Sequence, residues 1–287
     1  MRKGIILAGG KGSRLYPLTK SISKQLLPVY DKPMIFYPLT TLMLSGIRDI
    51  LIITNKEFLN FYKKLLGNGS KLGISINYKI QERPEGIAQA FLIGEEFIGS
   101  SKVCLILGDN IFYGNDLQKK LLKCNLESDN PTIFVYRVND PERYGVVKFK
   151  NGKSISIKEK PKKFLSNYAI TGIYFYDNSV LDLARNLTFS KRGELEISDI
   201  NKIYLRKKIL NVEVLGRGYT WLDTGTFQSL HDASLFIKTI QERQGLKVGI
   251  PEEIAWRNGW ISNQELKNIA TSHLDNSYGK YLNMLLI

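Results

Sequence analysis

The sequence has few of the residues that usually build metal centres or disulfide frameworks. Only two cysteines, Cys104 and Cys124, and two histidines, His231 and His273, occur among its 287 residues. The cysteines have neither the spacing of a zinc site nor that of a disulfide scaffold. A metal site would therefore have to be built from carboxylates, which favour a hard ion such as Mg²⁺.

Long apolar runs are also missing. No stretch approaches the roughly 20 residues that a transmembrane helix needs. The chain begins directly with a strand pattern, so we expect no signal peptide. A protein of the reducing cytoplasm, without membrane association, is the simplest expectation.

Acidic residues are scarce beside basic ones. The chain carries 41 Lys and Arg against 27 Asp and Glu, a formal net charge of +14. Nucleic-acid binding would be one explanation. However, the cations are scattered, and the densest runs, residues 158–163 and 206–208, are short. We favour a broadly basic surface that keeps a few cations for an anionic substrate, and we expect no nucleic-acid partner.

The first half of the sequence alternates strand and helix patterns. Apolar runs at residues 4–8, 50–53, 74–80 and 103–107 are typical of strands. A helix is expected to open at Pro33 and close at Gly46, and another to span residues 88–97. This rhythm predicts an α/β fold, with a mixed, mostly parallel Rossmann-like sheet flanked by helices.

The pattern changes after Pro131. Residues 132–138 and 168–176 are rich in β-forming residues, and the Asn151-Gly152 pair predicts a hairpin between residues 146–149 and 154–158. The end of the chain is helical, with a helix at residues 229–243 and a capping-box pattern at Ser262 and Glu265. We expect a single domain over residues 1–287, with a catalytic core to about 227 and a helical extension at about 228–287.

A glycine-rich turn follows the first predicted strand, at Gly9, Gly10 and Gly12. Such a turn lets backbone N–H groups approach phosphate oxygens without obstruction. It is not a Walker loop, and Leu15 stands where the dinucleotide fingerprint has its third glycine. The glycines alone would also suit an ordinary tight turn. Arg14 favours phosphate, because its planar guanidinium matches phosphate oxygens.

Two more charged residues fit an anionic substrate. Lys24 lies a short distance beyond the glycine turn and could neutralise a second phosphate group. Asp109 follows the strand at residues 103–107, at the edge where open α/β sheets bind ligands, and could hold Mg²⁺ against a triphosphate. Taken singly, each would more often be a solvated lysine or a turn aspartate.

Residues 9–15 followed by residues 24–28 resemble the signature of the sugar-1-phosphate nucleotidyltransferases. Further segments resemble those of thymidylyl-transferring members, in the same order and over nearly the whole chain: Gln81 with residues 86–90, then 107–110, 140–147, 159–161, 193–199, 218–226, 242–247 and 278–282. Ser13 and Ser198 stand where the family usually has Thr, and both keep the hydroxyl.

The resemblance implies roles for individual residues. Arg14, Lys24, Asp109 and Asp223 would be catalytic, and Asp109 and Asp223 would hold Mg²⁺. The implied nucleotide-binding residues are Gly9, Gly10, Gly12, Ser13, Arg14, Lys24, Gln25, Gln81, Gly86 and Asp109. The implied sugar-phosphate-binding residues are Asn110, Tyr144, Gly145, Glu159, Lys160, Ile170 and Arg192. An implied regulatory site contains Tyr113, Gly114, Gly218, Glu253 and Arg257.

The same resemblance implies a reaction. The phosphate of α-D-glucose 1-phosphate would attack the α-phosphorus of dTTP in line, giving dTDP-glucose and pyrophosphate, as the first step of dTDP-L-rhamnose biosynthesis for polysaccharides. The nucleophile is already anionic, so alignment and charge stabilisation would suffice without a general base. A homotetramer inhibited by its end product is also implied.

Other functions remain open at the level of sequence. UTP could replace dTTP, because an added methyl group discriminates by only about 1–3 kcal/mol. A non-catalytic nucleotide-sugar sensor could share the same fold. The presence of Asp109 and Asp223 together with the other polar residues of the motifs favours the enzyme.

Overall fold

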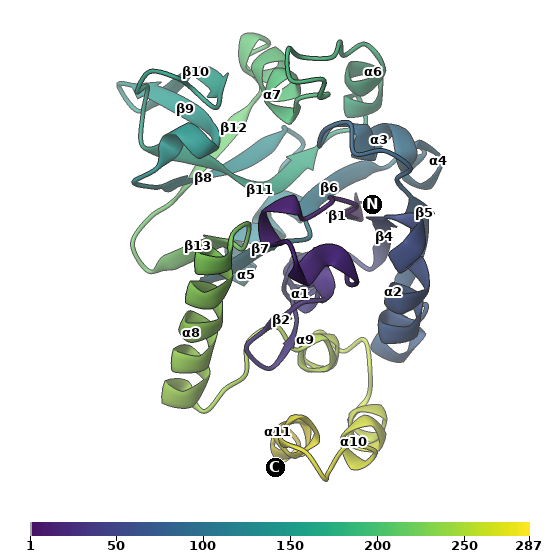
Figure 1. The fold of residues 1–287 in the computed structure, drawn as a ribbon. Coiled ribbons are helices and arrows are strands. Elements are labelled where there is room, and N and C mark those ends of the chain that lie inside the picture. Colours follow the sequence, from purple (N-terminus) through teal and green to yellow (C-terminus); the bar gives the residue numbers. More distant parts are fainter. Residues whose placement is uncertain (1) are drawn as a thin grey trace.

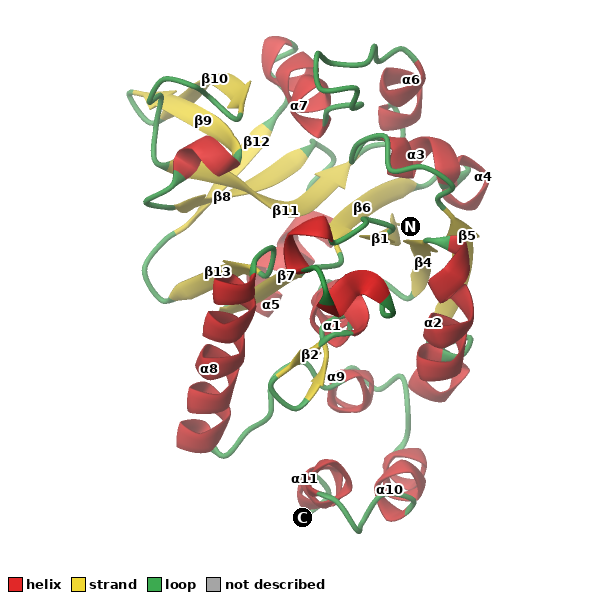
Figure 2. Cartoon of the chain, in the orientation of Figure 1, coloured by secondary structure: helices red, strands yellow, loops and turns green. Residues whose placement is uncertain are grey.

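The computed structural model describes residues 2–287. Within them a nine-stranded sheet forms the centre of the molecule, with helices on both of its faces (Figures 1 and 2). Its strands are β1 (Arg2–Ala8), β4 (Asp49–Thr54), β5 (Ser75–Ile80), β6 (Lys102–Leu107), β8 (Thr132–Arg137), β9 (Gly145–Lys150), β10 (Lys153–Glu159), β11 (Tyr168–Tyr176) and β12 (Asn211–Leu215).

The sheet has a parallel half and a mostly antiparallel half. Its order is β10-β9-β11-β6-β1-β4-β5, with β8 beside β11 and β12 beside β8. Strands β6, β1, β4 and β5 are parallel neighbours, whereas β11 runs antiparallel to β6, β8 and β9. The predicted mixed, mostly parallel α/β fold is confirmed, and β9 and β10 form the predicted hairpin at Asn151-Gly152.

Alternate residues of the central strands enter two different hydrophobic cores. On β1, Ile6 packs with Leu39 and Phe175, while its neighbour Ile5 packs with Phe91 and Tyr176. This follows from the two-residue period of a strand, which sends successive side chains to opposite faces. A sheet buried on both faces is therefore built from near-continuous apolar runs.

The helices fall into two groups according to these cores. Helices α1 (Phe36–Leu44), α2 (Leu59–Leu66) and α5 (Leu117–Leu126) contribute to the first core, and α3 (Gln89–Ile93), α6 (Val180–Arg185) and α7 (Ile197–Arg206) contribute to the second. The short helix α4 (Glu95–Ile98) follows α3. Two small ladders complete the strands, β2 (Pro28–Val29) with β3 (Lys32–Pro33) and β7 (Asn110–Gly114) with β13 (Tyr219–Asp223).

Two predicted helices differ in their bounds. The first begins at Phe36, because Pro33 belongs to the β2–β3 ladder. The second is divided between α3 and α4 at Gly94. A Cβ at position 94 would lie 2.9 Å from Ile5 Cδ1. Close packing of the helix on β1 therefore requires glycine there, and glycine weakens a helix interior.

The C-terminal helices are α8 (Phe227–Gln244), α9 (Pro251–Arg257), α10 (Asn263–Thr271) and α11 (Ser277–Met284). Helix α8 packs Ala233 and Ile237 into a small separate cluster, whereas the other three share the core of the sheet. Ala255, Leu266 and Leu282 belong to the same buried cluster as Ile6. The predicted capping box of Ser262 and Glu265 is confirmed at the start of α10. Figure 1 shows α10 and α11 at the end of the molecule far from β9 and β10.

In the part of the chain that the structure describes, no helix combines the length and the apolar character that crossing a membrane requires.

Candidate active site

The glycine turn lies at the carboxyl edge of the parallel strands. Strand β1 ends at Ala8 and its neighbour β6 ends at Leu107, so the segments that follow both strands meet at one edge. The N–H of Gly108 donates to Leu7 O at 2.9 Å, and Thr19 Oγ1 donates to Gly12 O at 2.9 Å. Gly12 has a φ of 61°, the left-handed region that favours glycine.

A cavity of about 170 Å³ opens beside this turn. It is lined by Gly10, Gly12, Ser13, Arg14, Lys24, Gln25, Asp109 and Gly225. All but Gly225 were predicted from the sequence as nucleotide-binding residues. Backbone N–H groups, two cations and a carboxylate around one cavity form a suitable receptor for a metal-bound polyphosphate.

A buried polar network lies behind the wall of the cavity that contains Gln25. Ser23 Oγ donates to Gln25 Oε1 at 2.9 Å and lies 2.8 Å from the hydroxyl of Tyr62 on α2. Tyr62 is fully buried and Ser23 and Gln25 nearly so. Sequence reasoning missed Tyr62, because a helical tyrosine carries no local signal of such a contact. The network fixes the segment that presents Lys24.

Two carboxylates distant in sequence converge at the same edge. The ladder of β7 and β13 places Asp223 opposite Asn110, next to Asp109. The N–H and Oγ1 of Thr224 both donate to Asp109 O, at 3.2 Å and 2.8 Å. Lys24 Nζ forms an ion pair with Asp109 Oδ2, and Arg143 Nη2 lies 3.4 Å from Asp223 Oδ2. The predicted pairing of the two aspartates is therefore geometrically possible.

The two aspartates have opposite pKa shifts. Burial opposes the ionisation of Asp109, but Lys24 and a hydrogen bond from Asn110 outweigh it and hold the pKa of Asp109 below its ordinary value. Burial and the neighbouring charge of Asp109 raise the pKa of Asp223, against the opposing effects of Lys24, Arg14 and Arg143. The second carboxylate thus lacks sufficient positive charge nearby.

This deficit fits a divalent cation held by few protein ligands. Among residues 2–287 there is no group of three or more His, Cys, Asp or Glu residues arranged to hold a metal. Mg²⁺ commonly takes only one or two carboxylates and completes its shell with water and substrate phosphates. The chemistry of Asp109 and Asp223, beside a phosphate-sized cavity, suits such an ion.

A second cavity, of about 210 Å³, lies next to the carboxylates. All seven predicted sugar-phosphate residues line it: Asn110, Tyr144, Gly145, Glu159, Lys160, Ile170 and Arg192. Arg14, Asp109 and Asp223 line it as well, so it is continuous with the proposed metal position. A Cβ at Gly145 would lie 3.0 Å from Glu159 Oε2. A side chain at position 145 would therefore crowd the carboxylate of Glu159 at the wall of this cavity.

The side chain of Asn110 connects β7 with β11, β13 and Asp109 through buried hydrogen bonds. Its Oδ1 accepts from the N–H of Gly172 at 3.1 Å and from Trp221 Nε1 at 2.5 Å, while its Nδ2 donates to Asp109 Oδ1 at 2.8 Å. Asn110 is 2% exposed. Sequence reasoning assigned it to the sugar phosphate only, and the buried contacts with β11 and β13 were not predicted.

Arg192 is surrounded by carboxylates. Its Nη1 lies 3.8 Å from Glu159 Oε1, its Nε lies 3.2 Å from Glu196 Oε1, and it forms an ion pair with Glu194. Burial and the charge of Glu196 raise the pKa of Glu159, against Arg192 and Lys160. Glu194, Glu196 and Arg143 line the cavity but were not predicted as site residues, although the motifs contain them.

Gln81 lies against the glycine turn, and Gly86 lies in the loop between β5 and α3. Gln81 follows β5 directly and its N–H donates to Thr54 O at 2.8 Å. A Cβ at Gly9 would lie only 2.0 Å from Gln81 Oε1, so a side chain at position 9 would displace the amide of Gln81. Gly86 has a φ of 106°, and a Cβ on it would lie 2.5 Å from Leu195 O. Neither Gln81 nor Gly86 lines the two cavities described above.

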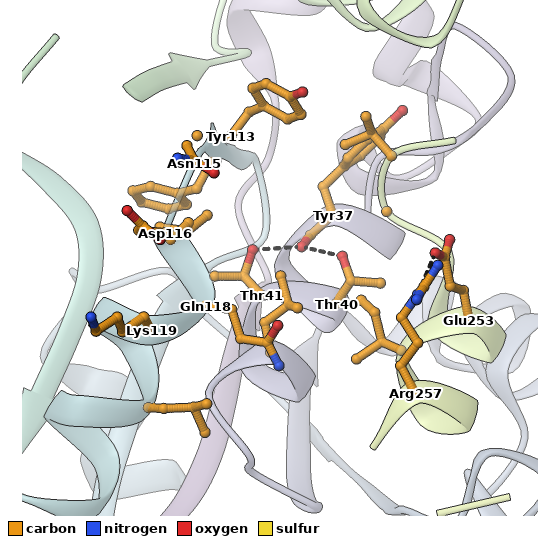
Figure 3. A pocket seen from close by; sticks show the side chains of 18 of the residues that line it. Tyr37, Thr40, Thr41, Tyr113, Asn115, Asp116, Gln118, Lys119, Glu253 and Arg257 are labelled. Carbon is orange, nitrogen blue, oxygen red and sulfur yellow. Dashed lines mark hydrogen bonds and ion pairs between the residues drawn. The ribbon is translucent and has the colours of Figure 1, made fainter. Parts of the chain in front are cut away.

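A third and larger cavity, of about 880 Å³, lies between α1, α5 and α9 (Figure 3). Tyr113, Gly114, Glu253 and Arg257 line it, as predicted for one site. Gly218 does not line it, but Gly218 O would lie 2.9 Å from a Cβ on Gly114. Figure 3 shows Arg257 paired with Glu253, with an Nε–Oε1 distance of 2.8 Å.

Comparison with known proteins agrees with this geometry. Residues 3–240 match the protein family described as nucleotidyl transferase. The chain is 56% identical to a glucose-1-phosphate thymidylyltransferase of Neisseria meningitidis, over 99% of both chains. It is 57% identical to one of Xanthomonas campestris, over 99% of this chain and 97% of the relative.

A solved structure supports the same assignment. A Bacillus anthracis protein described as a glucose-1-phosphate thymidylyltransferase, in complex with sucrose, is 43% identical with a TM-score of 0.76, over 82% of this chain and 95% of that one. The chain therefore belongs to the nucleotidyl transferase family, among the glucose-1-phosphate thymidylyltransferases.

Proposed function

We propose that the chain transfers a thymidylyl group from dTTP to α-D-glucose 1-phosphate, giving dTDP-glucose and pyrophosphate. The observation that carries this proposal is that the two cavities share Arg14 and Asp109, with Asp223 lining the second of them. One cavity suits a triphosphate and the other a sugar phosphate. Relatives with more than 50% identity over the whole chain carry the corresponding name.

In this mechanism the chain aligns two anions and stabilises charge. The backbone at Gly10–Gly12, together with Arg14 and Lys24, holds the triphosphate. Lys160 and Arg192 hold the phosphate of the sugar, and Glu159 and the backbone of Gly145 meet the sugar hydroxyls. A phosphate oxygen then attacks the α-phosphorus in line, and pyrophosphate leaves.

Arg14 is the residue best placed to serve both substrates, because it lines both cavities. Its guanidinium would stabilise charge that develops on the α-phosphate during the attack. Loss of one such donor costs roughly 10²–10³ in rate. No side chain needs to remove a proton, since the attacking phosphate is anionic at neutral pH.

Asp109 and Asp223 would hold Mg²⁺. The ion would supply charge neutralisation between the carboxylates and the phosphate oxygens of the substrates. Lys24 and Arg143, which pair with the two aspartates in the structure, would then be free to contact phosphate oxygens.

The third cavity would be a regulatory site for an end-product nucleotide sugar. Glu253 and Arg257 would meet its polar groups, and the cavity is distinct from the two at the carboxylates. We further propose that the chain works as one catalytic unit with its core to about residue 227, in a cytoplasmic homotetramer. Its product would enter dTDP-L-rhamnose and polysaccharide biosynthesis.

The direct test is pyrophosphate release from the purified protein with Mg²⁺, glucose 1-phosphate and each of dTTP, UTP, ATP, CTP and GTP. We expect release to be strongest with dTTP and to require both the metal and the sugar phosphate. Strongest release with UTP would reassign the base but keep the reaction. Binding of nucleotides without any release would instead support a nucleotide-sugar sensor.

A further inference from the structure

Three side chains beside the glycine turn form a directed chain of hydrogen bonds. Gln81 follows β5, Gln89 begins α3, and Glu85 lies in the loop between them. Gln81 Nε2 donates to Gln89 Oε1 at 2.5 Å, and Gln89 Nε2 donates to Glu85 Oε2 at 2.8 Å. The backbone N–H of Glu85 also donates to Gln89 Oε1, at 3.2 Å.

The chemistry of Glu85 fixes the direction of the whole chain. A backbone N–H can only donate, and a carboxylate can only accept. If the amide of Gln89 were turned over, its nitrogen would face the N–H and its oxygen would face the carboxylate, so both bonds would be lost. Gln89 must therefore present its oxygen to Gln81.

The orientation of the Gln81 amide is fixed as a consequence. Its nitrogen must face Gln89, so its oxygen points to the opposite side, toward the glycine turn. There, a Cβ at Gly9 would lie 2.0 Å from Gln81 Oε1. Gln81 is 3% exposed. The buried amide therefore holds its acceptor oxygen against Gly9, at the start of the glycine turn.

We propose that Glu85 and Gln89 are positioning residues that set base specificity through Gln81. This inference rests on the proposed function, with Gln81, one of the implied nucleotide-binding residues, reading the pyrimidine. Thymine and uracil carry an N–H at ring position 3, whereas cytosine carries a lone pair there. The fixed oxygen of Gln81 accepts a hydrogen bond from the first two bases and faces the lone pair of the third.

The loop that carries Glu85 is held independently of these side chains. The N–H of Leu195 donates to Glu85 O at 2.7 Å, and the N–H of Ala88 donates to Leu195 O at 3.2 Å. Gly86 packs so closely on Leu195 that no Cβ fits. Substitution of Gln89 should therefore change the direction of the amide of Gln81 without displacing the loop.

The test compares Gln89→Leu with the wild-type chain, using kcat/KM for dTTP and for dCTP with glucose 1-phosphate. Leucine offers no polar atom, so the amide of Gln81 is free to turn over. We expect the ratio of dTTP to dCTP to fall by about tenfold, as for loss of one orienting hydrogen bond. An unchanged ratio overturns the inference, even if both rates fall. Gln264→Leu, in an exposed amide pair with Asn268 on α10, is the matched control.

A double variant tests the direction itself. In Glu85→Gln combined with Gln89→Glu, the carboxylate at position 89 accepts from the N–H of residue 85 and from Gln81, and the new amide at position 85 donates to it. The polarity toward Gln81 is the same as in the wild type. We expect most of the specificity ratio to return, and a ratio as low as that of Gln89→Leu would contradict the proposal.

Calorimetric binding separates this inference from the proposed function. If the wild-type chain releases no pyrophosphate with dTTP, the proposed function fails. Binding of dTTP and dCTP to the wild-type chain and to Gln89→Leu then decides the inference alone. Selective weakening of dTTP binding supports it, and equal weakening or no change overturns it.

Discussion

The ammonium group of Lys24 forms an ion pair with the carboxylate of Asp109, at the carboxyl end of β6. The Lys24 side chain is 7% exposed and that of Asp109 is 21% exposed. The pair therefore occupies an oxygen that the proposed metal would use. Substrate binding must exchange this contact for contacts between Lys24 and phosphate and between Asp109 and the metal.

Lys24→Ala should separate the contribution of Lys24 to phosphate binding from its competition with the metal for Asp109. We expect kcat/KM to fall by about 10²–10³, because a charged contact to the triphosphate is lost. In the absence of nucleotide, Mg²⁺ should bind the Lys24→Ala variant more tightly than the wild type, because Asp109 no longer has a competing cation. Steady-state kinetics measure kcat/KM, and calorimetric titration measures the affinity for Mg²⁺. Lys20→Ala, on the exposed part of the same segment, is the control, and weaker Mg²⁺ binding in Lys24→Ala would refute the exchange.

Asp223→Asn should make the protein more stable and less active. Burial and the charge of Asp109 disfavour the ionised form of Asp223, so a neutral isostere removes a penalty at neutral pH. The same change removes a proposed metal ligand, so we expect activity to fall by about 10²-fold or more. Urea unfolding and pyrophosphate release at pH 7.5 give the two quantities. Loss of stability together with loss of activity would show that the charge is structural.

Glu252, on α9 and away from the proposed active site, should make the stability of the protein depend on pH. Burial raises the pKa of Glu252, although Tyr278 donates a hydrogen bond that opposes the shift. When folding raises the pKa of a carboxyl, the group's contribution to stability is fully present below its unfolded-state pKa of about 4.3. That contribution is lost as the pH rises through the pKa of the folded state. Glu252→Gln should therefore gain stability relative to the wild type as pH rises.

Paired urea titrations of the wild type and Glu252→Gln, from about pH 4 to pH 8, measure this difference, and other titrating groups cancel in the comparison. The unfolding free energy of the variant should exceed that of the wild type most at the upper end of the range. A difference that shrinks as pH rises would mean that the hydrogen bond from Tyr278 outweighs burial.

Tyr281→Phe should weaken regulation while leaving catalysis unchanged. Tyr281 on α11 donates to Glu253 Oε2 at 2.6 Å, and the other oxygen of Glu253 accepts from Arg257 at 2.8 Å. Without the hydroxyl, both Glu253 and Arg257 are held less firmly at the wall of the third cavity. We expect a several-fold higher concentration of dTDP-rhamnose for half-inhibition, with kcat and KM close to wild type.

Inhibition curves at several dTTP concentrations provide the measurement. The wild-type protein should show inhibition that excess dTTP does not remove, since the two sites are separate cavities. Purely competitive inhibition, or an unchanged curve for Tyr281→Phe, would remove the regulatory role from this cavity.

The sequence by itself determined the local elements and most residues of the site. Apolar runs and glycines predicted β1, β6 and the turn at Gly9–Gly12, because strand formation and tight turns depend on neighbouring residues. The position of Asp109 after a buried strand placed it at the binding edge. The motif order supplied Arg14, Lys24 and the sugar-phosphate residues, which the structure gathers around adjacent cavities.

Only the tertiary structure decided which of these groups interact. The register of β7 against β13 brings Asp223 to Asp109, and no local pattern encodes a pairing between strands so far apart in the chain. The same holds for the buried contact of Tyr62 with Ser23 and for the approach of Glu159 to Arg192. Such contacts depend on how whole elements pack, since side-chain distances across a core are set by the backbone of both partners.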